Sequence, residues 1–209
     1  MAQDKRIRRT QKLLGEALIK VALDKGYKNA TIQDVTKEAD IGYRTYFRHF
    51  NGLDELLIQV AQDRLDNFYE ILDLPLPGEM IADPVNFFQK IGKTLFEHIK
   101  ANEKTFRFLL MDDSSRFVLR PVMSRACGKA EILLRELPQE NIPSEVAANH
   151  IITSAFSLMR WWLENGLKHS PEKMGEIFSE LIVKPTWLVM TEGSFEARSS
   201  SRPQDADSK

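Results

Sequence analysis

Residues 41–50 read IGYRTYFRHF, a stretch that combines four aromatic side chains with two arginines and a histidine. One buried environment cannot hold all of them, because burying a charge without a partner is costly. If the stretch is helical, Tyr46 and Phe50 lie four residues apart and share one face. Arg44 and Arg48, also four apart, share another. The stretch therefore predicts a short helix with a buried aromatic side and a cationic side. That cationic side either meets a partner or is a solvated helix face.

The residues before this stretch complete the outline of a helix-turn-helix unit. The apolar period predicts a first helix from about residue 4 to residue 24. Thr31, followed by Asp34 three residues later, is a capping-box pattern that opens a second, short helix. Residues 40–42 form a tight turn, and the third helix covers about residues 43–49. Two short helices joined by a tight turn after a longer helix are typical of a helix-turn-helix.

The rest of the chain is also expected to be helical, because its apolar residues recur with a helical period and alternating β-branched runs are missing. Helices are predicted at about 53–72, 84–101, 103–111, 115–136, 144–167 and 171–190, and Pro185 should kink or shorten the last one. The expected fold class is all-α. It comprises an N-terminal three-helix helix-turn-helix unit (residues 1–52), a C-terminal helical bundle (residues 53–190) and a polar, Ser-rich tail predicted to be disordered (residues 191–209).

Charge is distributed unevenly along the chain. Residues 1–50 hold 11 Lys and Arg against 6 Asp and Glu, a net charge of +5 in a chain whose total is −1. The remaining residues therefore carry −6. A basic end on an acidic body suits a polyanion that is contacted by one end only. A solvated basic tail would give the same count.

The sequence gives no support to a membrane protein or a secreted one. The longest apolar runs, such as residues 151–159, stop far short of the ~20 residues that a membrane span needs. The first 25 residues lack the pattern of a secretory signal. A single cysteine, Cys127, allows no internal disulfide and agrees with a reducing compartment. We therefore expect a cytoplasmic protein.

An enzyme is not expected either. No HExxH, GxSxG, P-loop or CxxC motif occurs, and the four histidines lie far apart in the sequence. Cys127 and His150 could be imagined as a nucleophile and its base, but a buried free cysteine is usually inert packing. The sequence thus predicts no catalytic residues, no metal site and no cofactor.

The segment GYKNATIQDVTKEADIGYRTYFRHFNGLDEL, residues 26–56, resembles the DNA-binding domain of the TetR family of bacterial transcriptional regulators. The matching features are the Gly-Tyr before helix two, the Thr that opens it, the Asp-Val within it, the Arg-Thr pair at the start of helix three and the closing Phe-Arg-His-Phe. The resemblance is dense over residues 8–56. It implies a homodimeric regulator, expected to be a repressor, that binds a pseudo-palindromic operator and is released by a small molecule.

The resemblance also implies which residues contact DNA. They are Thr31, Tyr43, Arg44, Thr45, Phe47, Arg48 and His49, with Arg6, Arg8 and Arg9 of the basic leading segment able to add backbone or minor-groove contacts. An arginine fork suits guanine O6 and N7 or phosphate oxygens.

Four positions depart from the family pattern. Phe47 stands where the family usually has a tyrosine that touches phosphate, and Leu53 stands where a lysine is common, so both phosphate contacts are missing. In the turn, Asp40 and Gly42 replace the usual glycine and small polar cap. Asp tolerates a left-handed backbone, and Gly is an acceptable cap.

In TetR-like proteins the C-terminal region dimerises through its last two long helices, which here are residues 144–167 and 171–190. An apolar surplus on the first of them suggests a partner subunit. The residues of that surplus are Ile151, Ile152, Ala155, Phe156, Met159 and Trp162. The alternative is a helix buried on all sides within its own domain.

The same region is expected to bind the effector. Residues 96–123 weakly resemble family members that repress fatty-acid synthesis genes and sense acyl chains, which suggests a hydrophobic or acyl-like molecule. The candidate apolar lining is Phe88, Phe106, Phe108, Met111, Phe117, Met123, Phe156, Met159 and Trp161, and the candidate polar end is Arg107, Arg120 or His150. Each of these residues could instead be plain core.

The expected partners are therefore double-stranded operator DNA, a second copy of the chain and a small-molecule effector, with no membrane. The competing interpretation is a helix-turn-helix module that binds another protein without specific DNA binding. The contacts missing at Phe47 and Leu53 favour that alternative, and the basic segment from Arg6 to Lys12 disfavours it.

Overall fold

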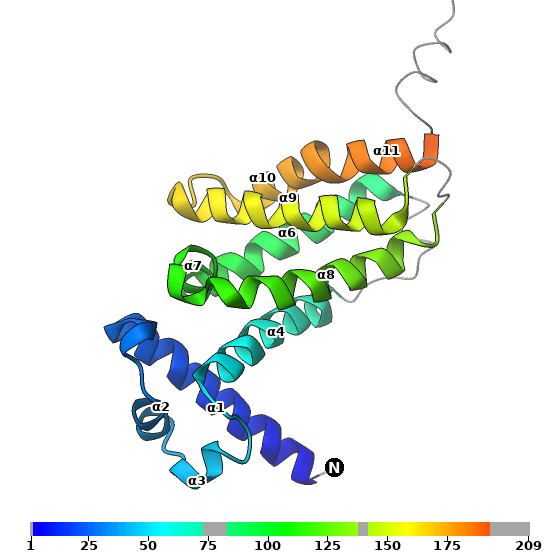
Figure 1. Ribbon diagram of the computed structural model, residues 1–209. Helices are drawn as coiled ribbons and strands as arrows, with labels where there is room; N and C mark the ends of the chain where they lie inside the picture. The colour runs from blue at the N-terminus through cyan, green and yellow to red at the C-terminus, as the bar shows by residue number, and fades with distance from the viewer. Residues whose placement is uncertain (1, 73–82, 138–141, 193–209) are drawn as a thin grey trace, which may run out of the picture.

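The computed structural model describes residues 2–72, 83–137 and 142–192 of the 209-residue chain, and every regular element in these ranges is a helix (Figure 1). In chain order the elements are α1 (Ala2–Lys25), η1 (Tyr27–Asn29), α2 (Ile32–Glu38), α3 (Tyr43–Tyr46), α4 (Leu53–Leu72), α6 (Pro84–Ala101), α7 (Glu103–Met111), η2 (Asp113–Val118), α8 (Leu119–Leu134), α9 (Ser144–Glu164), α10 (Pro171–Phe178), η3 (Ser179–Val183) and α11 (Lys184–Glu192). The predicted all-α class is confirmed. No helix in the described ranges is long and apolar enough to cross a membrane.

Helices α1, α2 and α3 form the N-terminal unit at one end of the molecule (Figure 1). Their shared core holds Leu14 and Leu18 of α1, Val35 of α2 and Tyr46 of α3, all of them fully buried. The Tyr46 hydroxyl donates to the carbonyl of Gly52 at 3.0 Å, which ties α3 to the start of α4. Burial of Tyr46 and Phe50 confirms the prediction that these two aromatics form the inner side of the opening stretch.

The turn between α2 and α3 has the geometry that its unusual residues allow. Asp40 adopts a left-handed backbone with φ of 53°, which a short polar side chain tolerates. Gly42 is the N-cap of α3. Helix α3 is shorter than the predicted span of residues 43–49. The amides of Arg48 and His49 bond to carbonyls only three residues back, so the segment after Tyr46 continues as tight turns.

The C-terminal bundle lies above this unit in Figure 1, and α4 leads from one to the other. Helices α6 and α10 approach backbone to backbone at Gly92 and Gly175. A Cβ added to Gly92 would lie 2.9 Å from the Cα of Gly175. The fully buried Trp162 of α9 packs edge-on against Phe96 of α6, with ring centroids 5.2 Å apart.

Three further helix boundaries differ from the predictions, each for a local reason. The helix predicted at 115–136 begins as the 3-10 turn η2, because the buried hydroxyl of Ser115 donates to the carbonyl of Phe108 at 2.6 Å. Helix α9 stops at Glu164 instead of residue 167, where Gly166 and Leu167 take left-handed conformations. Before Pro185, the last helix widens into the π-turn η3 and then continues to Glu192. Most of the predicted tail, residues 193–209, lies outside the described residues.

The two hydrophobic cores meet at the junction of the units. Phe108, Leu109 and Val118, from α7 and η2, belong to the same cluster as the buried residues of α1 and α2. Helix α4 contributes Leu56 and Leu57 to this cluster and Phe68 to the bundle side. The boundary placed between residues 52 and 53 therefore falls at a packed junction, with α4 shared by both sides.

Candidate DNA-binding face and effector cavity

The start of α2 is fixed by a capping box, as predicted. The amide of Asp34 donates to Oγ1 of Thr31 at 3.2 Å, and the amide of Thr31 donates back to Oδ2 of Asp34 at 2.9 Å. Lys25, at the end of α1, forms an ion pair with the same carboxylate. The hydrogen bond from Lys25, followed by that from Thr31, lowers the pKa of Asp34 to about 2. Asp34 thus stays ionised at neutral pH and holds Thr31 at the exposed tip of α2.

Helix α3 and the turn that follows it present two bare arginines. Arg44 and Arg48 are exposed, and neither guanidinium group has a hydrogen bond or an ion pair with any residue in the described ranges. Tyr43 and Phe47 flank them, 56% and 46% exposed, and pack edge to face with ring centroids 5.0 Å apart. Exposed aromatic rings rimmed by unpaired guanidinium groups are typical of a surface that binds a partner.

The other predicted DNA-contact residues lie nearby or on α1. Thr45 and His49 are half-buried, and the His49 ring is 6.4 Å from that of the core residue Phe50. On α1, Arg6, Arg8 and Arg9 are exposed, within the first turns of the helix. The structure therefore brings the predicted residues of α2, α3 and the following turn to one unit, with a basic segment at the free end of α1.

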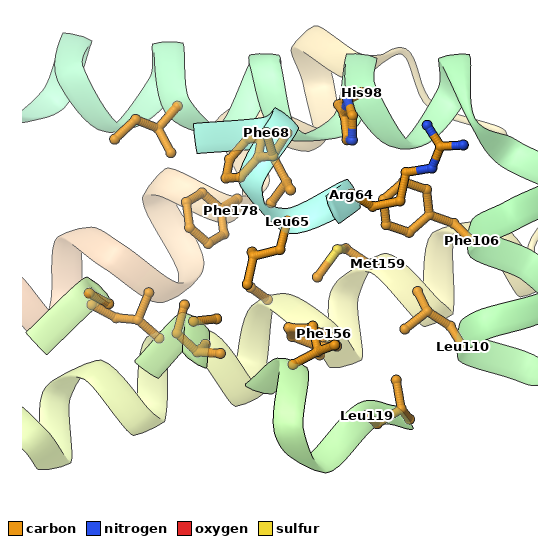
Figure 2. A pocket seen from close by; sticks show the side chains of 18 of the residues that line it. Arg64, Leu65, Phe68, His98, Phe106, Leu110, Leu119, Phe156, Met159 and Phe178 are labelled. Atoms are coloured by element: carbon orange, nitrogen blue, oxygen red, sulfur yellow. The ribbon is translucent and has the colours of Figure 1, made fainter. Parts of the chain in front are cut away.

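A cavity of about 160 Å³ lies inside the C-terminal bundle (Figure 2). Its walls come from α4, α6, α7, η2, α8, α9, α10 and η3, and they are almost wholly apolar. Labelled lining residues in Figure 2 are Leu65, Phe68, Phe106, Leu110, Leu119, Phe156, Met159 and Phe178. Such an apolar space, lined by helices of a bundle, is the usual form of a small-molecule site.

Two polar side chains line this cavity, Arg64 of α4 and His98 of α6 (Figure 2). His98 is only 8% exposed, and its Nε2 has no hydrogen-bond partner among the described residues. Its ring lies between those of Phe68 and Phe106, with centroids 6.2 and 5.6 Å away. Burial lowers the pKa of His98, and the positive charge of Arg64 lowers it further. The imidazole is therefore neutral at pH 7.

Arg64 also lines a second, polar groove on the outside of the same helix. That groove lies between α1, α4 and α8. In it, Arg125 of α8 donates to both oxygens of Asp66 on α4, at 2.8 and 2.6 Å. Arg64 therefore lines both the apolar cavity and the groove beside α1.

Only part of the predicted effector set lines the cavity. Phe88, Phe106, Phe156 and Met159 do so. Phe108, Met111, Phe117, Met123, Trp161, Arg107, Arg120 and His150 do not. On α7 the helical period turns Phe106, Leu109 and Leu110 toward the cavity, and it turns Arg107 and Phe108 away from it. The predicted polar end is thus replaced by Arg64 and His98.

The displaced residues have other surroundings. Phe108 packs against Tyr27 in the N-terminal core, and Arg107 pairs with Glu103 at 2.7 Å. Trp161 lies at the surface, where its ring stacks on His169. Arg120 and His150 are exposed to solvent.

The residues predicted for the dimer interface face inward. Ile151, Ala155, Met159 and Trp162 are at least 91% buried within the protomer. Ile152 and Phe156 line the cavity. The apolar surplus on α9 arises because the helix packs against α7, α8 and η3 at once, so this surplus is not an exposed interface.

His98 and Arg64 were missed by sequence reasoning, although each leaves a signal. His98 lies within a strongly amphipathic helix, next to the apolar Ile99 and two residues after Phe96. A histidine at such a position is a sign of either a satisfied core residue or a ligand contact. Arg64 falls among apolar positions of α4 in the same way.

The chain shows likeness to known regulators in sequence and in fold. Residues 86–184 match a family described as the transcriptional regulator C-terminal region. A TetR-family transcriptional regulator from Syntrophomonas wolfei superposes with a TM-score of 0.69 over 86% of this chain and 96% of that chain, at 14% identity.

Two further solved structures are similar. FadR from Bacillus subtilis, in complex with stearoyl-CoA, superposes with a TM-score of 0.64 over 82% of this chain and 97% of that chain, at 14% identity. SmeT, the repressor of the Stenotrophomonas maltophilia multidrug efflux pump SmeDEF, gives 0.64 over 84% and 89%, also at 14% identity. At these identities the likeness to each structure is one of fold.

Proposed function

Because the chain belongs to the TetR family of transcriptional regulators, we propose that it binds a pseudo-palindromic DNA operator as a homodimer and is released by a small hydrophobic effector. The observation that carries the DNA-binding part is the pair of exposed, unpartnered arginines on one side of the α3 segment, opposite the buried Tyr46 and Phe50. Arg44 and Arg48 would read guanine edges or clamp phosphates, and Thr31, Tyr43, Thr45, Phe47 and His49 would surround them.

The basic end of α1 adds to this proposal. The first turns of α1 carry three exposed arginines, Arg6, Arg8 and Arg9. This helix shares its core with α2 and α3, and we call α1, α2 and α3 together the reading unit. The charges of the three arginines would be drawn to the phosphate backbone whatever the base sequence, so they would supply affinity and salt dependence. Recognition of the base sequence would depend on α3.

A dimer would place two such reading units on successive major grooves, about 34 Å apart. The outward faces of α9 and of the last helical segment support a two-fold contact there. Val146 and Trp161 on α9 are 53% and 44% exposed, and Leu181 of η3 is 67% exposed. This surface replaces the inward-facing residues that the sequence suggested.

The effector would occupy the apolar cavity. The cavity supports a hydrophobic molecule because almost all of its lining is aliphatic or aromatic. FadR of Bacillus subtilis, which is similar in fold, was solved with stearoyl-CoA. That precedent agrees with a hydrophobic effector here, and a cavity of about 160 Å³ argues for a molecule smaller than stearoyl-CoA.

Helix α4 would transmit effector binding from the cavity to the reading unit and so release the protein from DNA. Ala61 of α4 belongs to the core beneath the reading unit and also lines the cavity, while Leu65 and Phe68 line the cavity one and two turns further on. A molecule that binds one arrangement of α4 better than another shifts the population toward it, by as much as the two affinities differ. If that arrangement spaces the two reading units wrongly, the dimer leaves its operator. A regulator of this type would act in the cytoplasm, as a repressor.

The alternative function is a helix-turn-helix module that binds another protein. Phe47 supports it, because its exposed ring lacks the hydroxyl that could reach a phosphate. The test is fluorescence anisotropy of the purified protein with DNA from upstream of its own gene and with scrambled DNA, each at several salt concentrations. Tight binding to the upstream DNA alone supports the regulator. Equal binding to both, together with failure of random-site selection, would leave the protein-binding alternative.

A further inference from the structure

The unpartnered Nε2 of His98 is the feature of the cavity that calls for a ligand atom. It lies on a side chain that is 8% exposed, among Phe68, Phe106 and Arg64 (Figure 2). A buried polar atom without a partner costs free energy comparable to a lost hydrogen bond. A bound molecule that supplied the partner would recover this cost.

The chemistry of that partner follows from the state of the ring. A backbone hydrogen bond of Arg64 raises the pKa of His98, as a carbonyl that accepts from the ring does. Nε2 has no partner, so this bond belongs to Nδ1. The donated hydrogen is therefore on Nδ1. In a neutral imidazole with its hydrogen on Nδ1, Nε2 is an acceptor. Nε2 therefore presents a lone pair to the cavity, and its partner must be a hydrogen-bond donor.

A carboxylate cannot satisfy this atom, because an ionised carboxylate only accepts hydrogen bonds. Reversing the roles would require a proton on Nε2, which burial and the charge of Arg64 both oppose. Thioester and ester carbonyls fail for the same reason. A hydroxyl fits, since it donates to Nε2 and its oxygen can still accept from the nearby guanidinium of Arg64.

The size of the space narrows the choice further. At about 160 Å³, the cavity is close to an engineered apolar cavity of ~150 Å³ that takes up benzene. Aromatic walls such as Phe68, Phe88 and Phe106 suit a flat ring.

From these observations we infer that the effector is a single-ring aromatic alcohol, a phenol or a close relative, whose uncharged hydroxyl donates a hydrogen bond to Nε2 of His98. This inference rests on the proposed function only in calling the ligand an effector. The binding itself is independent of DNA.

The test compares three probes of one shape, 4-fluorophenol, 4-fluorotoluene and 4-fluorobenzoate, by fluorine NMR titration of the full chain without DNA. The variants are His98→Phe and, as a matched control, His150→Gln, which alters an exposed histidine of α9 outside the cavity. We expect His98→Phe to weaken 4-fluorophenol about tenfold and to leave 4-fluorotoluene within about twofold, because only the phenol loses a hydrogen bond. His150→Gln should change neither affinity.

Three results would overturn the inference. They are an equal loss for the phenol and the toluene in His98→Phe, tighter binding of the benzoate than of the phenol, and no binding of any probe. If His98→Phe does not fold, the nitrogen NMR signals of 15N-histidine-labelled wild type give the answer. The phenol should shift the His98 Nε2 signal and the toluene should not, and an unmoved signal contradicts the proposal. A protein that passes this test and binds no operator would refute the proposed function alone.

Discussion

The hydroxyl of Tyr27 donates a hydrogen bond of 2.5 Å to Oδ1 of Asp54, so the turn before α2 is joined to the first turn of α4. The Tyr27 ring also contacts Phe108 and Phe117 of the bundle, with centroids 6.0 and 6.2 Å away. Burial and the neighbouring Asp54 carboxylate raise the pKa of Tyr27, which keeps the phenol neutral. One side chain therefore links the N-terminal unit, α4 and the C-terminal bundle.

Replacing Tyr27 by Phe should lower the free energy of unfolding by about 1 kcal/mol, because the ring contacts remain and one hydrogen bond is lost. Urea denaturation measures it. Tyr43→Phe is the control: its exposed hydroxyl has no hydrogen bond with the described residues, and the change should stay within about 0.5 kcal/mol. Equal effects in the two variants would show that the Tyr27–Asp54 bond contributes nothing.

Gly92→Ala should destabilise the bundle by about 1–3 kcal/mol, because the new methyl group would meet the backbone of Gly175. Gly128→Ala is the matched control, on an exposed side of α8 where a Cβ meets nothing within 4 Å. There the better helix propensity of alanine should stabilise the protein by about 0.5–1 kcal/mol. Opposite signs in thermal melts are the expected outcome. A stabilised Gly92→Ala would mean that the α6–α10 crossing is looser than described.

Arg44→Ala or Arg48→Ala should weaken operator binding by about 1–3 kcal/mol if the arginine is bidentate to guanine, and should relax base preference at that position. Lys90→Ala removes the same charge from an exposed site on α6 and should leave binding nearly unchanged. Anisotropy titrations at one fixed salt concentration measure both. Unchanged affinity in the two arginine variants would contradict the assignment of the reading face.

Leu181→Glu should shift the proposed dimer toward monomer, because it places a charge at an exposed apolar position of the segment proposed for the two-fold contact. Ile132→Glu makes the same change on α8, where the side chain is similarly exposed, and should not affect assembly. Sedimentation velocity separates the two states. If Ile132→Glu were monomeric and Leu181→Glu remained dimeric, the interface would involve α8 instead.

The pH dependence of stability should carry the signature of His98. The folded pKa is lowered below the ordinary 6.5, so between these two values the unfolded chain binds a proton that the folded chain does not. The contribution of His98 is complete above pH 6.5 and is lost as pH falls toward the lower folded pKa. His98→Phe should therefore lose less stability than wild type between pH 8 and pH 5.5 in urea denaturation. Parallel curves would show that His98 is not shielded from protonation.

The fold of the N-terminal unit could be predicted well from the sequence, because its determinants are local. The cap at Thr31, the left-handed Asp40 and the four-residue spacing of Tyr46 and Phe50 act within a turn or two of the chain. Such features are visible without knowing which helix packs on which.

The bundle was harder to predict because burial there depends on distant neighbours. The sequence shows an apolar excess on α9 but not that α7, α8 and η3 cover it, so it suggests an interface at inward residues such as Trp162. The side of α7 that faces the cavity likewise depends on where α4 lies. For this reason Phe106 lines the cavity and Phe108 packs against Tyr27.

The central claim is that this chain reads DNA sequence as a two-fold dimer. Selection of binding sites from a random-sequence DNA pool, with wild type and the Arg44→Ala variant run in parallel, tests it most directly. We predict an enriched inverted repeat with half-site centres about one helical turn apart, and loss of base preference in both half-sites of the variant. Enrichment of no sequence, or of a single unrepeated site, would contradict the account.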